Sequence, residues 1–203
     1  WYRSPWIGYT TAAPSQGADL LVQADFRLSP ALSGYLRFKN ENKEVKEKSD
    51  NRYLHATLHR SQVRFHFRYE PEGPFYLRSR IETVILRRPT REQGILFYQD
   101  VGWTPQKPPL SASLRVALFF TDSYNSRIYT YENDLLYSFA VPAFFGEGLR
   151  SYLNLHYRFS SKIDGWFKIG HTRYFDRETI SSGYSEIAGH SRGELKIELR
   201  YRF

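Results

Sequence analysis

The last nine residues of the chain alternate between two chemical classes. Apolar or aromatic side chains occupy every second position and charged side chains lie between them: Leu195, Ile197, Leu199, Tyr201 and Phe203 alternate with Lys196, Glu198, Arg200 and Arg202. Successive side chains of a β-strand point to opposite faces, whereas an amphipathic helix repeats every 3.6 residues. The segment therefore predicts a strand with one apolar face and one charged face.

The same period of two recurs along the chain. The apolar series run through Leu20–Leu28, Leu36–Phe38, Val63–Tyr69, Leu114–Leu118 and Leu153–Phe159. Alternation is noisier over 74–87 and less regular over 163–174. Helical periodicity, internal repeats and composition breaks are all lacking. We therefore expect an all-β fold and a single domain spanning residues 1–203.

Alternation of this kind occurs in soluble antiparallel sheets and in transmembrane barrels. Three features favour the barrel: an arginine-rich polar face, an apolar face rich in the 16 Tyr and 15 Phe, and segments close to the length of membrane strands. No apolar run approaches the ~20 residues of a membrane helix. We expect an antiparallel transmembrane β-barrel of about 10–12 strands, with a soluble β-barrel or sandwich as the alternative.

Turn residues suggest how the strands connect. Short turn-rich connections lie at 29–33, 71–74, 105–109 and 160–164, and longer ones at 40–51, 88–93 and 175–191. Outer-membrane barrels have short periplasmic turns and longer external loops, which makes the C-terminus periplasmic. The charged stretch 41–50 is interpreted as a solvated loop.

The number of strands depends on two segments. Residues 123–148 must begin and end on the external side, so they form either one long external hairpin or an extra pair of spanning strands. Counting 1–11 as an irregular first strand gives ten spans, or twelve with the extra pair. A chain of 203 residues without methionine indicates a processed or excised part of a longer protein.

The alternating charged residues are interpreted as the lining of the barrel. Charges facing lipid would cost about 2–4 kcal/mol each at mid-membrane. The candidate lumen residues are Arg64, Arg68, Arg78, Arg80, Glu82, Arg158, Glu198 and Arg200. Arg202 extends the set, and Glu70, Glu82 and Glu198 are the expected acidic partners. A ten-stranded barrel would be filled by such pairs, whereas a wider one with net charge +8 would leave an anion-preferring channel.

One polar stretch between the strands is a second candidate site. Its residues are Arg127, Tyr129, Tyr131, Glu132, Asn133 and Asp134. Folded inward, Arg127, Tyr131, Glu132 and Asp134 would form a constriction or a ligand contact. Folded outward, they would form a charge-paired external rim, and this second interpretation is favoured.

Catalytic and metal-binding patterns are weak. The absence of cysteine excludes disulfides and thiol nucleophiles. His55 and His59 share a strand face but lie too far apart for joint ligation, so neither a metal nor a cofactor is expected. A hydrolytic group could be built from His171, Asp176 and Ser181 or Ser182, but the spacing of these residues matches no known catalytic signature. We expect a protein that is not an enzyme, with an outer-membrane hydrolase as the alternative.

Two resemblances support an outer-membrane location. The sequence Leu199-Arg-Tyr-Arg-Phe203 resembles the terminal motif of outer-membrane proteins, which implies recognition by the assembly machinery through Leu199, Tyr201 and Phe203. Residues 94–100, 126–134 and 179–187 make 59–203 similar to the C-terminal region of Bacteroidetes outer-membrane proteins labelled as helix-hairpin-helix proteins. That resemblance implies an upstream helical domain.

The helical pair of those proteins does not occur in these 203 residues, so a nucleic-acid partner is not expected. The combined expectation is an integral barrel in the outer membrane of a Gram-negative bacterium. It would serve as an anchor or as a passive pore, with outer-membrane lipid and the assembly machinery as partners. The remaining alternative is a soluble barrel that binds an apolar ligand inside.

Overall fold

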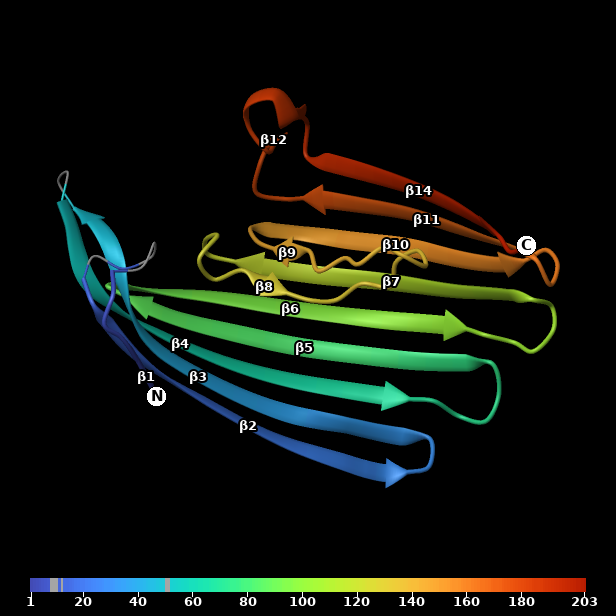
Figure 1. Ribbon diagram of the computed structural model, residues 1–203, viewed down its shortest axis with the longest axis horizontal. Helices are drawn as coiled ribbons and strands as arrows, with labels where there is room; N and C mark the ends of the chain where they lie inside the picture. The colour runs from blue at the N-terminus through green and yellow to red at the C-terminus, as the bar shows by residue number, and fades with distance from the viewer. Residues whose placement is uncertain (8–10, 12, 50–51) are drawn as a thin grey trace.

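The chain forms one large, curved antiparallel sheet (Figure 1). The computed structural model describes residues 1–7, 11, 13–49 and 52–203, without the side chains of 47–49 and 52–55. Ten strands follow one another in sheet order: β1 (Tyr2–Ser4), β2 (Ser15–Ser29), β3 (Leu32–Ser49), β4 (Arg52–Tyr69), β5 (Phe75–Arg88), β6 (Thr90–Trp103), β7 (Leu110–Thr121), β10 (Glu147–Arg158), β11 (Ile163–Tyr174) and β14 (Ser191–Tyr201).

Four two-residue strands form two small hairpins outside the large sheet. They are β8 (Ile128–Tyr129) with β9 (Ala143–Phe144), and β12 (Thr179–Ile180) with β13 (Ile187–Ala188). A 3₁₀ turn covers Gly183–Ser185. Among the described residues, no helix has the length and apolar character needed to cross a membrane.

The all-β, antiparallel prediction is confirmed, but the sheet is not closed into a barrel. β14 pairs with β11, while β1 covers only the first three residues of β2. No described strand joins the two sides, so the prediction of a closed barrel is not met by this structure. Of the expected first strand, 1–11, Tyr2–Ser4 form the short β1, and residues 8–10 lie outside the described part.

The two faces of the sheet differ as the alternation predicts. Cross-strand pairing aligns the apolar positions in continuous rows, such as Leu36, Phe65, Ile81, Phe97 and Leu118 from β3 to β7. Leu114, Leu153, Ile169 and Leu195 form a second row across β7, β10, β11 and β14. Side chains of these rows are largely exposed. We call this the apolar face and the opposite one the charged face.

The short turns lie together at one end of the sheet, as predicted. They connect β2 to β3, β4 to β5, β6 to β7 and β10 to β11, and the C-terminus lies at the same end (Figure 1, right). The predicted connection at 175–191 lies at the opposite end. At 88–93 the predicted loop is much shorter, because only Pro89 separates β5 from β6.

The interpretation of 41–50 as a loop was wrong. β3 continues to Ser49 and β4 begins at Arg52. The two strands pair without a break from Lys43 opposite Leu58 to Ser49 opposite Arg52. Val45 and Leu58 are buried and pack with Leu86 of β5. Charged residues surround Val45 in the sequence and hide the strand pattern, which becomes recognisable only once its partner strand is known. Residue 50 lies outside the described part.

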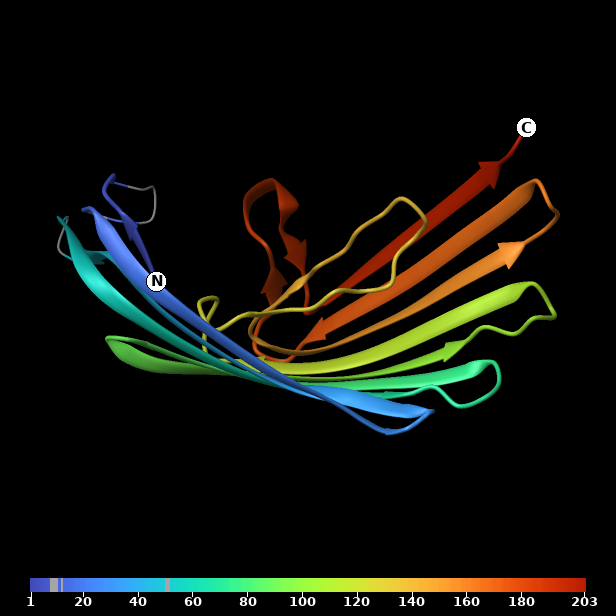
Figure 2. The same cartoon turned by 60° about the horizontal axis from the view of Figure 1, so that its bottom comes forward.

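The segment between β7 and β10 differs from both predictions. Residues 122–146, here called the strap, are neither an external hairpin nor a pair of spanning strands. They fold back over the concave side of the sheet, against the charged face (Figure 2). Buried Ile128 and Phe144 of the strap pack on Leu96, Tyr98 and Phe119 of β6 and β7. This apolar contact explains why the segment lies on the concave side of the sheet.

Candidate functional site: the charged face and its strap

Glu82 is the centre of the first ion-pair cluster on the charged face. Its side chain has no exposed surface. Arg64 of β4 donates two hydrogen bonds to it, Nε–Oε2 at 2.6 Å and Nη2–Oε1 at 3.0 Å, and Gln62 donates a third. Arg80 lies 3.8 Å away on the same strand as Glu82. The cluster brings together the predicted lumen residues Arg64, Arg80 and Glu82, and Gln62 is a further member that was not among them.

A second cluster lies at the short-turn end of β4 and β5. Arg78 donates to Glu70 through Nη2 at 2.8 Å, and Arg68 lies 3.7 Å from the same carboxylate. Its members are more exposed than Glu82. The predicted partner Glu70 is therefore in place, at the edge of the charged face.

The third cluster has an acid that sequence analysis missed. Asp164 of β11 accepts hydrogen bonds from Arg200 at 2.7 Å and from Arg202 at 2.9 Å, while Arg158 lies 3.5 Å away. Glu198, the predicted partner, lies opposite Trp166 in the strand register instead. Sequence analysis assigned Asp164 to the turn at 160–164, whereas β11 already begins at Ile163.

Two further residues of the charged face form a buried ion pair that was not singled out. Arg115 of β7 donates to Asp100 of β6, with Nη2–Oδ2 at 2.6 Å. The guanidinium stands 3.9 Å from the centre of the Tyr98 ring and also faces Tyr152. Arg115 additionally donates to the main-chain oxygen of Tyr131 in the strap. The pair thus supports the strap from below.

The acidic residues of the strap hold it to β10, β11 and β14. Glu132 accepts hydrogen bonds from Arg150, Nε–Oε1 at 2.6 Å and Nη2–Oε2 at 2.8 Å. Asp134 accepts from Lys196 at 2.7 Å. The side chains of both acids are fully buried. The strap therefore contacts the charged face through two ionic anchors, which we call the acid latch (Glu132 and Asp134).

Lys168 of β11 lies at the centre of the acid latch. Its side chain is completely buried, and its Nζ is 3.6 Å from Glu132 and 3.5 Å from Asp134. Glu194 of β14 lies 3.8 Å away. The Tyr152 ring centre is 4.8 Å from the same nitrogen. A buried ammonium is costly without compensating charge, so the strap's acids are needed where they are.

The electrostatics of the strap follow from these contacts. Burial would raise the pKa of Asp134, but the hydrogen bond from Lys196, the backbone N–H of Leu135 and the charge of Lys168 together hold it below its ordinary value of 3.8. Arg127 donates to the Tyr129 hydroxyl at 2.7 Å and lowers the pKa of that phenol. Asp134 therefore carries a negative charge at neutral pH.

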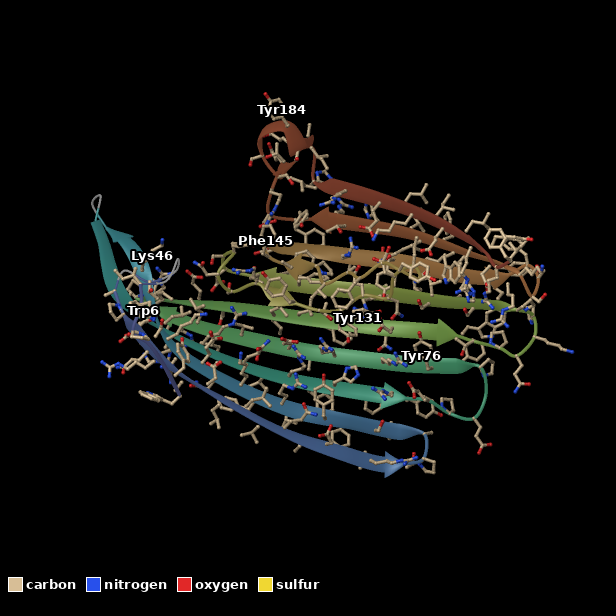
Figure 3. All side chains as sticks on the ribbon, viewed as in Figure 1. Trp6, Lys46, Tyr76, Tyr131, Phe145 and Tyr184 are labelled. Carbon is tan, nitrogen blue, oxygen red and sulfur yellow. The ribbon has the colours of Figure 1, made fainter. Side chains whose placement is uncertain are left out.

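The four predicted rim residues lie in three different places. Glu132 and Asp134 form the acid latch on the charged face. Arg127 stays within the strap, bonded to Tyr129 and to the main-chain oxygen of Tyr124. Tyr131 lies over the middle of the sheet with its ring half exposed (Figure 3). Glu132 and Asp134 thus lie against the charged face, while the external rim and the inward-folded constriction both stay predictions.

The cation-rich part of the charged face lies beyond the strap, on β3 and β4. Between 33–45 and 56–68 the inward positions carry six basic residues and one acid. The basic ones are Arg37, Lys39, Lys43, Arg60, Arg64 and Arg68, and the acid is Glu41. Arg60 reaches the strap by donating to the main-chain oxygen of Arg127 at 2.8 Å.

The candidate hydrolytic residues are dispersed. His171 lies on the apolar face of β11, opposite Ser151. The Asp176 carboxylate is bonded to Arg177, which lowers the pKa of that carboxyl. Ser181 and Ser182 belong to the connection between β12 and the 3₁₀ turn. In the described residues no group of three or more potential metal ligands gathers; the side chain of His55 is outside that part, and His59 contacts Asn42.

The C-terminal motif lies on the free edge strand. Leu199 and Tyr201 point out from the apolar face of β14 and are more than half exposed. The Tyr201 and Phe203 rings meet edge to face with their centres 5.2 Å apart. No family model, curated protein or solved structure was found to match the chain.

Proposed function

We propose that the chain is the wall of an integral outer-membrane β-barrel, with the apolar face toward lipid and the charged face enclosing the interior. One observation carries the proposal: the burial of the two faces is inverted relative to a soluble sheet. Phe97 and Ile197 of the apolar face are 45% and 72% exposed, whereas Glu82, Glu132 and Lys168 of the charged face have fully buried side chains.

Water would not favour this arrangement. Soluble monomers rarely leave a large contiguous apolar patch uncovered, and here the patch extends over every long strand. In a bilayer the same surface contacts hydrocarbon, and the ion pairs stay in an interior shielded from it. A soluble barrel with an apolar ligand inside has less support, because the concave side is the charged one.

Within that barrel the strap favours a structural, anchoring role. It covers the charged face from β6 to β14 and is fixed there by Ile128, Phe144 and the acid latch. A second candidate is a narrow passage for small anions. The excess of basic residues on β3 and β4 favours this passage. Among the described interactions, the strap contacts these basic residues only through Arg60, so it leaves most of them uncovered.

The membrane assignment is tested by Phe97→Arg, in the middle of β6 on the apolar face. If lipid contacts this face, the charge destabilises the folded protein in the bilayer by about 2–4 kcal/mol. The matched control is Gln93→Arg, on the same strand and face but near its end, where the cost falls to about 0–1 kcal/mol. Folding is measured by heat-modifiable gel migration in vesicles across a urea series.

A soluble sheet predicts a different result. Phe97 is already half exposed to water, so an arginine there would change stability by no more than about 0.5 kcal/mol. Equal effects of Phe97→Arg and Gln93→Arg, or a monodisperse monomer without detergent, would contradict the proposal.

A further inference from the structure

The open sheet has two free strand edges. β14 pairs only with β11, and its outer backbone groups meet no described strand. β2 pairs with β1 at Ser15, Gln16 and Gly17, and the twelve residues from Ala18 to Ser29 have no partner on that side among the strands that the structure describes. Backbone groups without partners are costly in hydrocarbon, which is why membrane sheets close on themselves.

Strand direction restricts how these edges can be joined. The nine long strands from β2 to β14 alternate in direction, because each pairs antiparallel with the next. β2 and β14 therefore run the same way, and direct pairing between them would be parallel. Antiparallel closure needs an odd number of additional strands, and one strand opposite in direction to both edges is the smallest solution.

β1 already runs in the required direction. It pairs with β2 through Tyr2–Gly17, Arg3–Gln16 and Ser4–Ser15, so its N-terminal side points along the free part of β2. In this register Trp1 falls opposite Ala18, and polypeptide preceding Trp1 would pass Leu20, Val22 and Phe26 in turn. About a dozen residues would reach Ser29 at the short-turn end.

From this geometry we infer that β1 is the last part of the closing strand, and that polypeptide preceding Trp1 completes it between β2 and β14. Its side chains must match those of both neighbours. Toward lipid they lie beside Leu20, Val22 and Ile197, and so are apolar. Toward the interior they lie beside Gln23, Asp25 and Lys196, and so are polar. The inference rests on the proposed barrel, since only closure in a membrane requires the strand.

The first test determines where the mature protein begins. The protein is expressed from its own gene, with any residues encoded before Trp1 retained, and extracted from membranes for N-terminal sequencing and intact mass. We expect at least a dozen residues before Trp1, alternating between apolar and polar. A mature N-terminus at Trp1 would overturn the inference.

The second test asks which strand occupies the edges. Hydrogen exchange compares that protein with the 203-residue chain in the same detergent. Alternate amides of β2 between Ala18 and Ser29, and of β14, should exchange at least tenfold more slowly in the longer protein. Equal protection in both proteins would mean that the edges close in another way.

Cysteine pairs distinguish direct closure, since the chain has no native cysteine. Val22→Cys is combined in turn with Leu195→Cys, Ile197→Cys and Leu199→Cys. No intramolecular disulfide should form in the longer protein, whereas the control pair Ile169→Cys with Leu195→Cys, which face each other in the register, should oxidise. A β2–β14 disulfide in the monomer would overturn the inference while leaving the membrane assignment, tested by Phe97→Arg, intact.

Discussion

Glu132 compensates two cations at once, the partly buried Arg150 and the fully buried Lys168. Replacing it by glutamine keeps the shape but leaves both positive charges with one acid fewer. Removing one partner of a buried ion pair costs about 3–5 kcal/mol. We expect Glu132→Gln to lower the free energy of unfolding by that amount, measured by urea titration in detergent.

The matched control for this change is Glu186→Gln, an exposed acid in the connection between β11 and β14. It should change the free energy of unfolding by no more than about 0.5 kcal/mol. An equally small effect of Glu132→Gln would show that the acid latch does not hold the strap.

Asp134 makes the attachment of the strap depend on pH. Because its pKa in the folded protein is lowered from 3.8, its stabilising contribution is complete above that value. The contribution is lost as pH falls through the lowered pKa. We expect the strap to detach only below about pH 3.8, followed by the fluorescence of a dye on Ser138→Cys, an exposed position of the strap.

The control is Asp134→Asn in the same labelled protein. The amide cannot titrate, so the fluorescence change below pH 3.8 should shrink and the strap should be looser at neutral pH. An unchanged acid transition would assign the titration to another group.

Alternation in the sequence was enough to predict on which face of the sheet the charged residues of the regular strands lie. Arg64, Arg80 and Glu82 were placed on one face correctly, because side-chain direction follows from position in a strand. Partner choice was not predictable. Asp164 and Lys168 bind residues that become neighbours only through the register of β11 with β10 and β14, and the sequence pattern of 163–174 is too irregular to fix that register.

At the level of elements, the long strands and the short-turn end were predictable, and the strap was not. Its contacts reach across the chain: Glu132 binds Arg150, and Asp134 binds Lys196 sixty-two positions away. The strap also buries apolar groups without any regular period, so that no strand or helix pattern could distinguish an inward from an outward path.

Ile128 tests whether apolar packing helps to hold the strap. It is fully buried among Leu96, Phe119 and Phe144. Ile128→Ala should lower the free energy of unfolding by about 2–5 kcal/mol, since truncating a buried aliphatic side chain leaves a cavity. The measurement is urea unfolding, with Leu136→Ala, an exposed strap residue, as the control. Equal effects of the two changes would place the strap's stability in the acid latch alone.

At the scale of the whole molecule, the strap can be removed without breaking the sheet. Phe120 of β7 and Glu147 of β10 face each other in the register, so a three-residue connection, Thr121-Asn-Gly, is enough to join these strands. Replacing 122–146 by Asn-Gly therefore keeps every long strand. In the barrel proposed above, this change should open the interior, because the strap lies against the charged face.

The expected result is a larger single-channel conductance in planar bilayers. The basic residues of β3 and β4 remain in place, and the deletion removes Glu132 and Asp134, so the reversal potential in a KCl gradient should show a preference for chloride. The matched control shortens 176–188, a connection at the same end of the sheet, and should leave conductance unchanged. Equal conductance of both variants would mean that the strap does not narrow the interior, and a preference for potassium would contradict a role for the β3–β4 cations in selectivity.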